Sequence, residues 1–288
     1  MVLAALALPA MGAAGPRIVS LAPHLTELLY AAGAGEYLVG ASEYSDYPPA
    51  ARDLPRVGDS FRLDYERIVA LQPDFVVAWE SGTPVASIAR LEALGLRVVV
   101  LPVRTLGDIV AAVAELGALA GTGQMAATAA GQLEQDLADL RQRYASREPV
   151  RVFIQLDDEP LFTVTGRHLI SEMVELCGGV NVFAGLPGLA PSVDLEAVIG
   201  ADPEAILYTG TDQNPQRRWS KWQDLAAVRL GAVRRVSPDL VVRATPRAVA
   251  GVREICDAIE LTRERRHEAG IDGHGPSGDD ARSPLGEN

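Results

Sequence analysis

Short apolar runs alternate with segments in which apolar residues recur every three or four positions. Before residue 105 the runs predict buried strands at residues 17–21, 38–41, 74–79 and 97–101. The segments between them predict helices that start at Thr26, Leu63 and Val85. An alternation of strand and helix is typical of a parallel α/β lobe.

The same alternation restarts at residue 150. Strands are predicted at 150–156, 205–209 and 233–236, and helices at 169–177, 193–200, 222–228 and 246–261. The chain therefore predicts a second α/β lobe of the same plan.

One long helical segment, residues 124–147, separates the two patterns. It is rich in strong helix formers, and Pro149 ends it. Thr105 and Asp108 form a capping box for a preceding helix that runs through residue 119. The spacing of three and four predicts that one face of the long helix is buried. Its apolar positions are Ala126, Ala129, Ala130, Leu133, Leu137, Leu140 and Tyr144. We expect two Rossmann-like lobes joined by this helix.

The ends of the chain differ from the lobes in composition. Residues 1–15 form an apolar run that finishes in small residues, as a secretory signal does, although a buried N-terminal helix or strand is the alternative. Residues from 263 onward are charged and Gly-rich. We divide the chain into a signal remnant (1–15), an N-terminal lobe (16–104), a helical linker (105–148), a C-terminal lobe (149–262) and a disordered tail (263–288).

An internal repeat relates residues 63–79 to residues 193–209. At an offset of 130 residues Glu66 matches Glu196, and flanking aspartates and prolines match in register. Acidic residues in a first helical turn also suit the helix dipole, which is the simpler explanation. Two equivalent carboxylates, one on each lobe, would alternatively suit a symmetric basic partner.

Composition and motifs exclude several classes of function. The 288 residues carry a net charge of −12, which argues against a nucleic-acid partner. No histidines and cysteines fall at metal-ligand spacing, and no nucleophile or phosphate-binding motif occurs. Asp157 and Asp158 are adjacent carboxylates, but such a pair is more often a solvated loop than a catalytic dyad. We expect a binding protein, not an enzyme.

The two cysteines, Cys177 and Cys256, are an even number in a chain that we expect to be exported. One disulfide closing a loop of 79 residues is the first interpretation, and two buried thiols are the alternative.

The candidate ligand site lies in the loops after the strands, because open α/β sheets bind ligands beyond the carboxyl ends of their strands. Those loops hold an unusual share of the aromatic residues, which suits a flat, partly apolar ligand bound between the lobes. Asp239 and Arg243 would bond its polar rim. The expected lining residues are Pro23, Tyr44, Phe61, Trp79, Phe162, Asp239 and Arg243.

Several stretches resemble the periplasmic vitamin B12 (cobalamin) binding proteins of ABC importers. The matching pieces are RIVSLAPHLTELLYAAGA, SEYSDYPP, LDYERIVALQPDFVVAW, LCGGVNVF and VVRATPRAV. The cobalamin-binding proteins belong to a wider group whose members also bind iron–siderophores and haem. The resemblance implies the class III fold, with a helical backbone between the lobes, and a monomer without a cofactor whose transported ligand is cobalamin or a related corrinoid.

The resemblance also implies roles for particular residues. Tyr44 contacts the corrinoid from the first lobe, and Asp239 and Arg243 from the second. Cys177 pairs with Cys256. Glu66 and Glu196 dock onto arginines of the permease dimer.

The sequence departs from this pattern at two positions. Ser60 and Ala190 stand where the cobalamin binders carry tryptophans. A haem or siderophore ligand therefore stays open.

Overall fold

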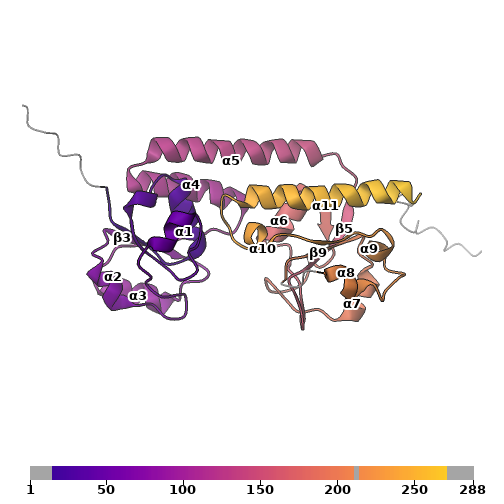
Figure 1. Cartoon of the computed structure of the whole chain (residues 1–288), viewed down its shortest axis with the longest axis horizontal. Coiled ribbons are helices and arrows are strands. Elements are labelled where there is room, and N and C mark those ends of the chain that lie inside the picture. Colours follow the sequence, from indigo (N-terminus) through magenta and orange to yellow (C-terminus); the bar gives the residue numbers. More distant parts are fainter. Residues whose placement is uncertain (1–14, 211–213, 271–288) are drawn as a thin grey trace, which may run out of the picture.

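Two α/β lobes lie side by side under one long helix in the computed structural model (Figure 1). The structure describes residues 15–210 and 214–270. Nearly all of the predicted signal segment and residues 271–288 of the predicted tail lie outside the described residues.

The first lobe is built on a four-stranded parallel sheet in the order β2-β1-β3-β4. Its strands are β1 (Ile18–Ser20), β2 (Leu38–Ala41), β3 (Phe75–Trp79) and β4 (Val98–Leu101). The connecting helices are α1 (Pro23–Ala31), α2 (Tyr65–Ala70) and α3 (Val85–Ala93), with short 3₁₀ turns η1 (Gly35–Tyr37) and η2 (Pro49–Asp53).

The second lobe repeats this plan with a parallel sheet in the order β10-β9-β5-β8. Its strands are β5 (Val150–Gln155), β8 (Gly179–Asn181), β9 (Ala205–Tyr208) and β10 (Val233–Arg235), with a hairpin of β6 (Asp157–Asp158) and β7 (Leu161–Phe162). Its helices are α6 (Leu169–Leu176), α7 (Leu195–Ala201), α8 (Pro215–Trp219), α9 (Ala226–Arg229), α10 (Pro238–Val241) and α11 (Ala248–Glu268). Strand β5 occupies the place of β1, and β9 the place of β3.

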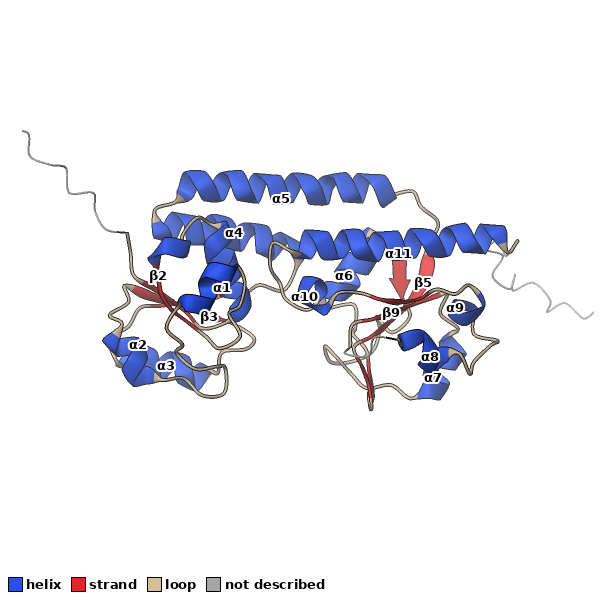
Figure 2. Ribbon diagram, in the orientation of Figure 1, coloured by secondary structure: helices blue, strands red, loops and turns tan. Residues whose placement is uncertain are grey.

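Both faces of each sheet are covered, which explains why the strands read as continuous apolar runs. In β1 the side chain of Ile18 packs in the cluster with α1 and α4, and Val19 packs in the cluster with α2 and α3. In β5 Val152 packs in the cluster with α6 and α11, whereas Phe153 packs with Trp219 on the opposite face of the sheet. Figure 2 shows these layers in both lobes.

The predicted spine is helix α5 (Gly123–Tyr144), which runs back along α4 (Leu106–Ala120) after a two-residue turn and then leads into β5 (Figure 1). The capping box of Thr105 and Asp108 at the start of α4 is confirmed. All of the predicted apolar positions of α5 pack against the main core; Ala126, Ala130, Leu137, Leu140 and Tyr144 are buried, and Ala129 and Leu133 are partly buried. This core is continuous between the lobes, because α4, α5, α6 and α11 contribute to it together.

The predicted disorder from residue 263 is wrong for residues 263–268, which complete helix α11. Arg263 and Arg266 are only 4% and 5% exposed. Arg266 pairs with Glu148 and Glu204, and it also donates to the carbonyl oxygen of Pro149. Residues 263–268 therefore belong to the second lobe. Their buried guanidinium groups neutralise carboxylates and donate hydrogen bonds to carbonyl oxygens at the end of the linker.

Several element predictions also need correction. Helix α1 begins at Pro23 instead of Thr26, because proline at the first helical position gives up no hydrogen bond. Helix α9 starts at Ala226 instead of residue 222. The sequence reading missed β8, the β6–β7 hairpin, α8 and α10, all of which are five residues or shorter.

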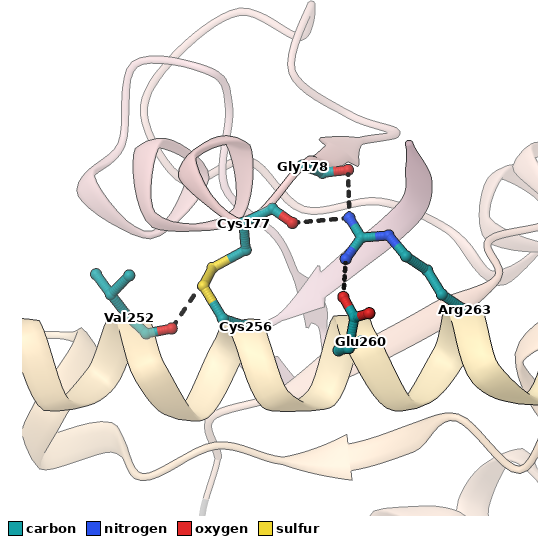
Figure 3. The surroundings of a disulfide bond; sticks show 6 residues. All are labelled: Cys177, Gly178, Val252, Cys256, Glu260 and Arg263. Carbon is teal, nitrogen blue, oxygen red and sulfur yellow. Dashed lines mark hydrogen bonds and ion pairs between the residues drawn. A yellow bond between two sulfur atoms is a disulfide. The ribbon is translucent and has the colours of Figure 1, made fainter. Parts of the chain in front are cut away.

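The disulfide between Cys177 and Cys256 is confirmed, and its Cα atoms are 4.9 Å apart. It ties the end of α6 to the middle of α11 (Figure 3). Arg263 lies beside it and donates to the carbonyl oxygen of Cys177 at 2.8 Å while pairing with Glu260 at 2.7 Å. The disulfide and the hydrogen bond from Arg263 to Cys177 together fasten α11 to the end of α6, while Glu260 neutralises Arg263 within α11.

Candidate functional site

Two adjoining cavities have volumes of about 540 and 430 Å³; residues of both lobes line the larger one, and residues of the first lobe alone line the smaller one. Pro23, His24 and Trp79 line both of them, so these three residues form a shared wall. The larger cavity is further lined by Ser81, Val103, Arg104, Arg167, His168, Leu169, Leu189, Val242, Arg243 and Ala244. The smaller cavity is further lined by Leu21, Ala22, Ser42, Glu43, Tyr44, Asp59, Ser60, Phe61, Gly82 and Thr83.

The shared wall stands at the topological switch point of the first sheet. Strand β1 lies between β2 and β3 in the sheet. The chain leaves β1 toward β2 on one side and leaves β3 toward β4 on the other. Pro23 and His24 follow β1, and Trp79 ends β3. Crevices of this kind are where open α/β sheets bind ligands. The predicted location of the site therefore agrees with a real cavity.

The indole of Trp79 is held by the loop that follows it. The backbone N–H of Trp79 donates to the hydroxyl of Thr83 at 3.0 Å. A Cβ atom at Gly82 would overlap the indole ring, so only glycine leaves room for Trp79 in this position. The loop thus presents one large aromatic face to both cavities.

His24 packs edge-on against Trp79, with ring centroids 4.8 Å apart and planes at 79°. Burial, followed by the charge of Arg243, lowers the pKa of His24 to about 4. Burial also lowers the pKa of His168, whose Nδ1 accepts the N–H of Ile170 at the start of α6. The imidazole of His24 is therefore neutral at pH 7.

Three arginines give the larger cavity cationic groups. Arg104 pairs with Glu80 on the first lobe, and Arg167 donates to the carbonyl oxygen of Gly188 on the second. Arg243 reaches across the cleft to Asp46, with 3.1 Å between Nη1 and Oδ1. Arg243 is the one arginine among the lining residues expected from the sequence, and the structure adds Arg104 and Arg167 to it.

A second arginine of the same segment, Arg247, bonds the first lobe directly. Arg247 donates twice to Glu27 of α1, at 2.8 and 2.7 Å, and its guanidinium lies 4.1 Å from the ring centre of Tyr47. Glu27 is 4% exposed. The Glu27 hydrogen bond raises the pKa of Arg247 although burial opposes this. Burial by itself would raise the pKa of Asp46. The hydrogen bond from Arg243 and the positive charge of Arg243 nevertheless hold that pKa below its usual value.

The predicted lining residues divide into two sets. Pro23, Tyr44, Phe61, Trp79 and Arg243 line one or both cavities. Phe162 on β7 and Asp239 on α10 line neither of these two cavities.

Two aromatic residues of the smaller cavity are unusually open to solvent. Tyr44 and Phe61 are 73% and 96% exposed. Tyr44 also has a φ of 63°, a left-handed conformation that is rare for a bulky residue. Such backbone outliers cluster at ligand sites. Both rings thus stand free at the rim of the cleft.

The residues that sequence reasoning missed are His24, Arg104, Arg167, His168 and the pair of Glu27 and Arg247. For Arg247 a signal existed, since it ends the same D-x-x-x-R-A-x-P-R stretch that contains Asp239 and Arg243. A glutamate on the buried face of a predicted helix was the corresponding signal for Glu27.

The two repeat glutamates occupy equivalent positions. Each is the second residue of a short helix, α2 or α7, whose aspartate cap, Asp64 or Asp194, accepts a backbone N–H at 2.9 Å. The pattern of burial is the same in 64–70 and 194–200, with both glutamates exposed. In Figure 1 α2 and α7 lie at the ends of the two lobes that point away from α5.

The adjacent aspartates do not form a catalytic dyad at the cleft. Asp158 accepts hydrogen bonds from Gln155 and Tyr208, and it pairs with Arg218. Neither Asp157 nor Asp158 lines the cavities. Over residues 15–210 and 214–270, no cluster of three metal-ligating side chains occurs. No helix in those same ranges has the length and apolar character to cross a membrane.

Comparisons with known proteins agree with this architecture. Residues 18–242 match the family model described as periplasmic binding protein. The chain is 37% identical over 250 residues to the vitamin B12-binding protein of Vibrio cholerae, covering 86% of this chain and 91% of that relative. It is 36% identical over 248 residues to the vitamin B12-binding protein of Pectobacterium atrosepticum, covering 84% of this chain and 88% of that relative.

The fold matches solved structures over the same range. The crystal structure of the periplasmic vitamin B12 binding protein BtuF of Vibrio cholerae superimposes with a TM-score of 0.80 at 37% identity, covering 87% of this chain and 98% of that one. The periplasmic heme-binding protein RhuT from Roseiflexus sp. RS-1 shares the fold with a TM-score of 0.75 at 23% identity, covering 86% of this chain and all of that one (100%). Two α/β lobes under a helical spine are thus common to these proteins, and the chain belongs to the periplasmic binding protein family.

Proposed function

We propose that this protein is an exported solute-binding protein that captures cobalamin or a closely related corrinoid between its lobes and delivers it to an ABC importer. The observation that carries the proposal is the pair of cavities at the switch point of the first sheet, in a chain 37% identical to a vitamin B12-binding protein. Capture and release make and break no covalent bond, so the protein needs no catalytic residue and no cofactor of its own.

The lining of the cleft suits a corrinoid. A corrinoid is a broad, flat macrocycle with an apolar face and a rim of amide side chains. Trp79, Phe61 and Tyr44 offer aromatic faces for the ring. Arg243 and Arg104 offer donors to amide oxygens at the rim.

Phe162 and Asp239 lie outside the two cavities, so a ligand confined to those cavities would not contact them. Phe162 is 36% exposed on the β6–β7 hairpin, and Asp239 lies on α10, one turn before Arg243. A ligand that extends beyond the two cavities toward the second lobe would reach them. The role of Asp239 without such an extended ligand is electrostatic, because its charge helps raise the pKa of Arg247.

Delivery rests on the equivalent glutamates. Glu66 and Glu196 are exposed, identically capped and carried on matching elements of the two lobes. A monomer with two such carboxylates presents a pseudo-symmetric acidic surface to a dimeric permease with basic residues at its mouth.

A haem or ferric siderophore is the second candidate. The observation that favours it is the set of three arginines in the larger cavity, Arg104, Arg167 and Arg243. Guanidinium groups pair well with the carboxylates of haem and with the anionic groups of siderophores.

One titration separates these candidates. The purified protein is mixed with cobalamin, cobinamide, haem or a ferric siderophore, desalted, and examined for retained absorbance, and affinities are then measured by calorimetry. We expect the corrinoids to be retained and to bind most tightly. Retention of haem or siderophore without corrinoid would overturn the corrinoid proposal and leave the fold assignment intact.

A further inference from the structure

Two polar nitrogen atoms in the shared wall of the cavities lack hydrogen-bond partners. They are Nε2 of His24 and Nε1 of Trp79, and each is buried from water. Among the residues that the structure describes, neither atom has a protein partner. Buried polar atoms are almost always paired, so two orphans in neighbouring rings call for a physical explanation.

The two rings belong to the candidate site, and Trp79 also packs against the main core. His24 is 7% exposed, and both residues line both cavities. Their centroids are 4.8 Å apart in an edge-to-face arrangement. The two rings are therefore in direct contact within one wall of the cavities.

The chemistry of the two atoms is complementary. An indole nitrogen can only donate a hydrogen bond, whereas a neutral imidazole offers one donor nitrogen and one acceptor nitrogen. Burial and the nearby Arg243 keep the imidazole neutral, since they lower the pKa of His24 to about 4. With its proton on Nδ1, the neutral imidazole presents Nε2 as an acceptor beside the Trp79 donor, and this pair fits a group that both accepts and donates.

We propose that His24 and Trp79 together bind a primary amide of the ligand, with the amide oxygen accepting from Trp79 Nε1 and the amide NH₂ donating to His24 Nε2. The inference rests on the proposed corrinoid function and names the group by which this wall recognises the ligand. Both nitrogens are buried in this structure, so the proposal requires the rings to rotate when the ligand binds. In this tautomer a carboxylate at the same position has no proton to donate to Nε2, so the pair selects amide-bearing over acid-bearing ligands.

The test compares cobalamin with its mono-acids, in which one amide at a time is hydrolysed to a carboxylate. We expect the protein to bind one of these mono-acids about ten-fold or more weakly than cobalamin, the usual effect of leaving one buried hydrogen-bonding group unpaired. The variant His24→Phe keeps the shape of the ring and removes its nitrogens. It should bind cobalamin more weakly and lose most of the discrimination against that mono-acid.

Two further variants keep the result specific. His24→Gln restores an acceptor and a donor on the side chain and should recover part of the discrimination. His267→Phe makes the same substitution at an exposed histidine near the end of α11 and should change neither affinity. Thermal unfolding of each variant confirms that it is folded.

Three results would overturn the inference. If His24→Phe discriminates against every mono-acid as the parent protein does, the amide contact lies elsewhere while the corrinoid function stands. If aquocobinamide shows an imidazole-type shift in absorbance on the parent protein but not on His24→Phe, then His24 binds cobalt instead of an amide. If the parent protein binds no corrinoid, the proposed function and this inference fall together.

Discussion

The carboxylate of Glu27 receives two hydrogen bonds from the guanidinium of Arg247 across the boundary between the lobes, at 2.7 and 2.8 Å. Glu27 belongs to α1 of the first lobe, and Arg247 immediately precedes α11 of the second. Arg243 adds a third charge 3.9 Å from the same carboxylate. This is a bidentate ion pair with a buried carboxylate, and it links the two lobes directly.

Removal of the carboxylate should destabilise the protein strongly. In Glu27→Ala the Arg247 guanidinium, with only 21% of its side chain exposed, loses its charged partner. We expect the free energy of unfolding to fall by about 3 kcal/mol, as for other buried pairs broken on one side. Chemical denaturation measures this change. The control is Glu80→Ala, which breaks an exposed pair with Arg104 and should cost less than about 1 kcal/mol. Equal effects of the two substitutions would contradict the assignment of Glu27 as the inter-lobe anchor.

The disulfide should account for a large part of the stability of the second lobe. In the chain-entropy model a closed loop of 79 residues contributes up to about 4.5 kcal/mol. We therefore expect Cys177→Ala combined with Cys256→Ala to lower the free energy of unfolding by several kcal/mol. A reductant should lower the free energy of unfolding of the parent protein to nearly that of the double variant, and it should leave the double variant unchanged. A double variant as stable as the oxidised parent would show that Arg263 and the core alone hold α11.

The lobes and the spine could be predicted because their signals are local. Apolar runs of four to six residues predict buried strands, and the spacing of three and four in α5 identifies its buried face from Ala126 to Tyr144. The repeat of 64–70 in 194–200 was readable for the same reason, since cap, carboxylate and buried position all lie within one helical turn. The cleft followed from topology, because the carboxyl ends of β1 and β3 meet at one switch point.

The rest depended on contacts between residues far apart in the chain. Arg263 and Arg266 resemble a solvated tail until the carbonyl oxygens of Glu148 and Pro149 are placed beside them. Glu27 and Arg247 are 220 residues apart, so no local pattern pairs them. Periodicity also does not predict which buried polar atoms lack a hydrogen-bond partner. The unpartnered nitrogen of His24 is known only from the structure, in which Trp79 packs against its ring.

The two exposed glutamates should serve delivery and not ligand binding. Changing Glu66 and Glu196 together to arginine replaces two negative charges with positive ones on α2 and α7, and neither glutamate lines a cavity. We expect transport through the importer to be abolished while corrinoid affinity changes less than two-fold. The measurements are uptake in cells and calorimetry on the purified variant.

The matched control for this prediction lies on the other side of the molecule. Glu134 and Asp139 are exposed on α5, and their joint change to arginine alters the net charge by the same amount. This variant should transport normally. If it abolishes transport as well, net charge and not a docking surface is responsible; if the Glu66 and Glu196 variant loses ligand affinity, these residues serve the cleft or the fold.

The buried histidine of the shared wall should make stability depend on pH. Its pKa lies near 4 in the folded protein, below the value of 6.5 expected for the unfolded chain, so the unfolded state takes up the proton first. The stabilisation is complete above about pH 6.5 and is lost as the pH falls toward the folded value. Between pH 7 and pH 5 we expect His24→Phe to lose about 2 kcal/mol less of its free energy of unfolding than the parent protein. His168→Asn, which keeps an acceptor for the N–H of Ile170, should retain the part of the slope due to His24. Parallel curves for the parent and His24→Phe would show that His24 titrates in the folded protein as it does in the unfolded chain, and that its burial carries no electrostatic cost.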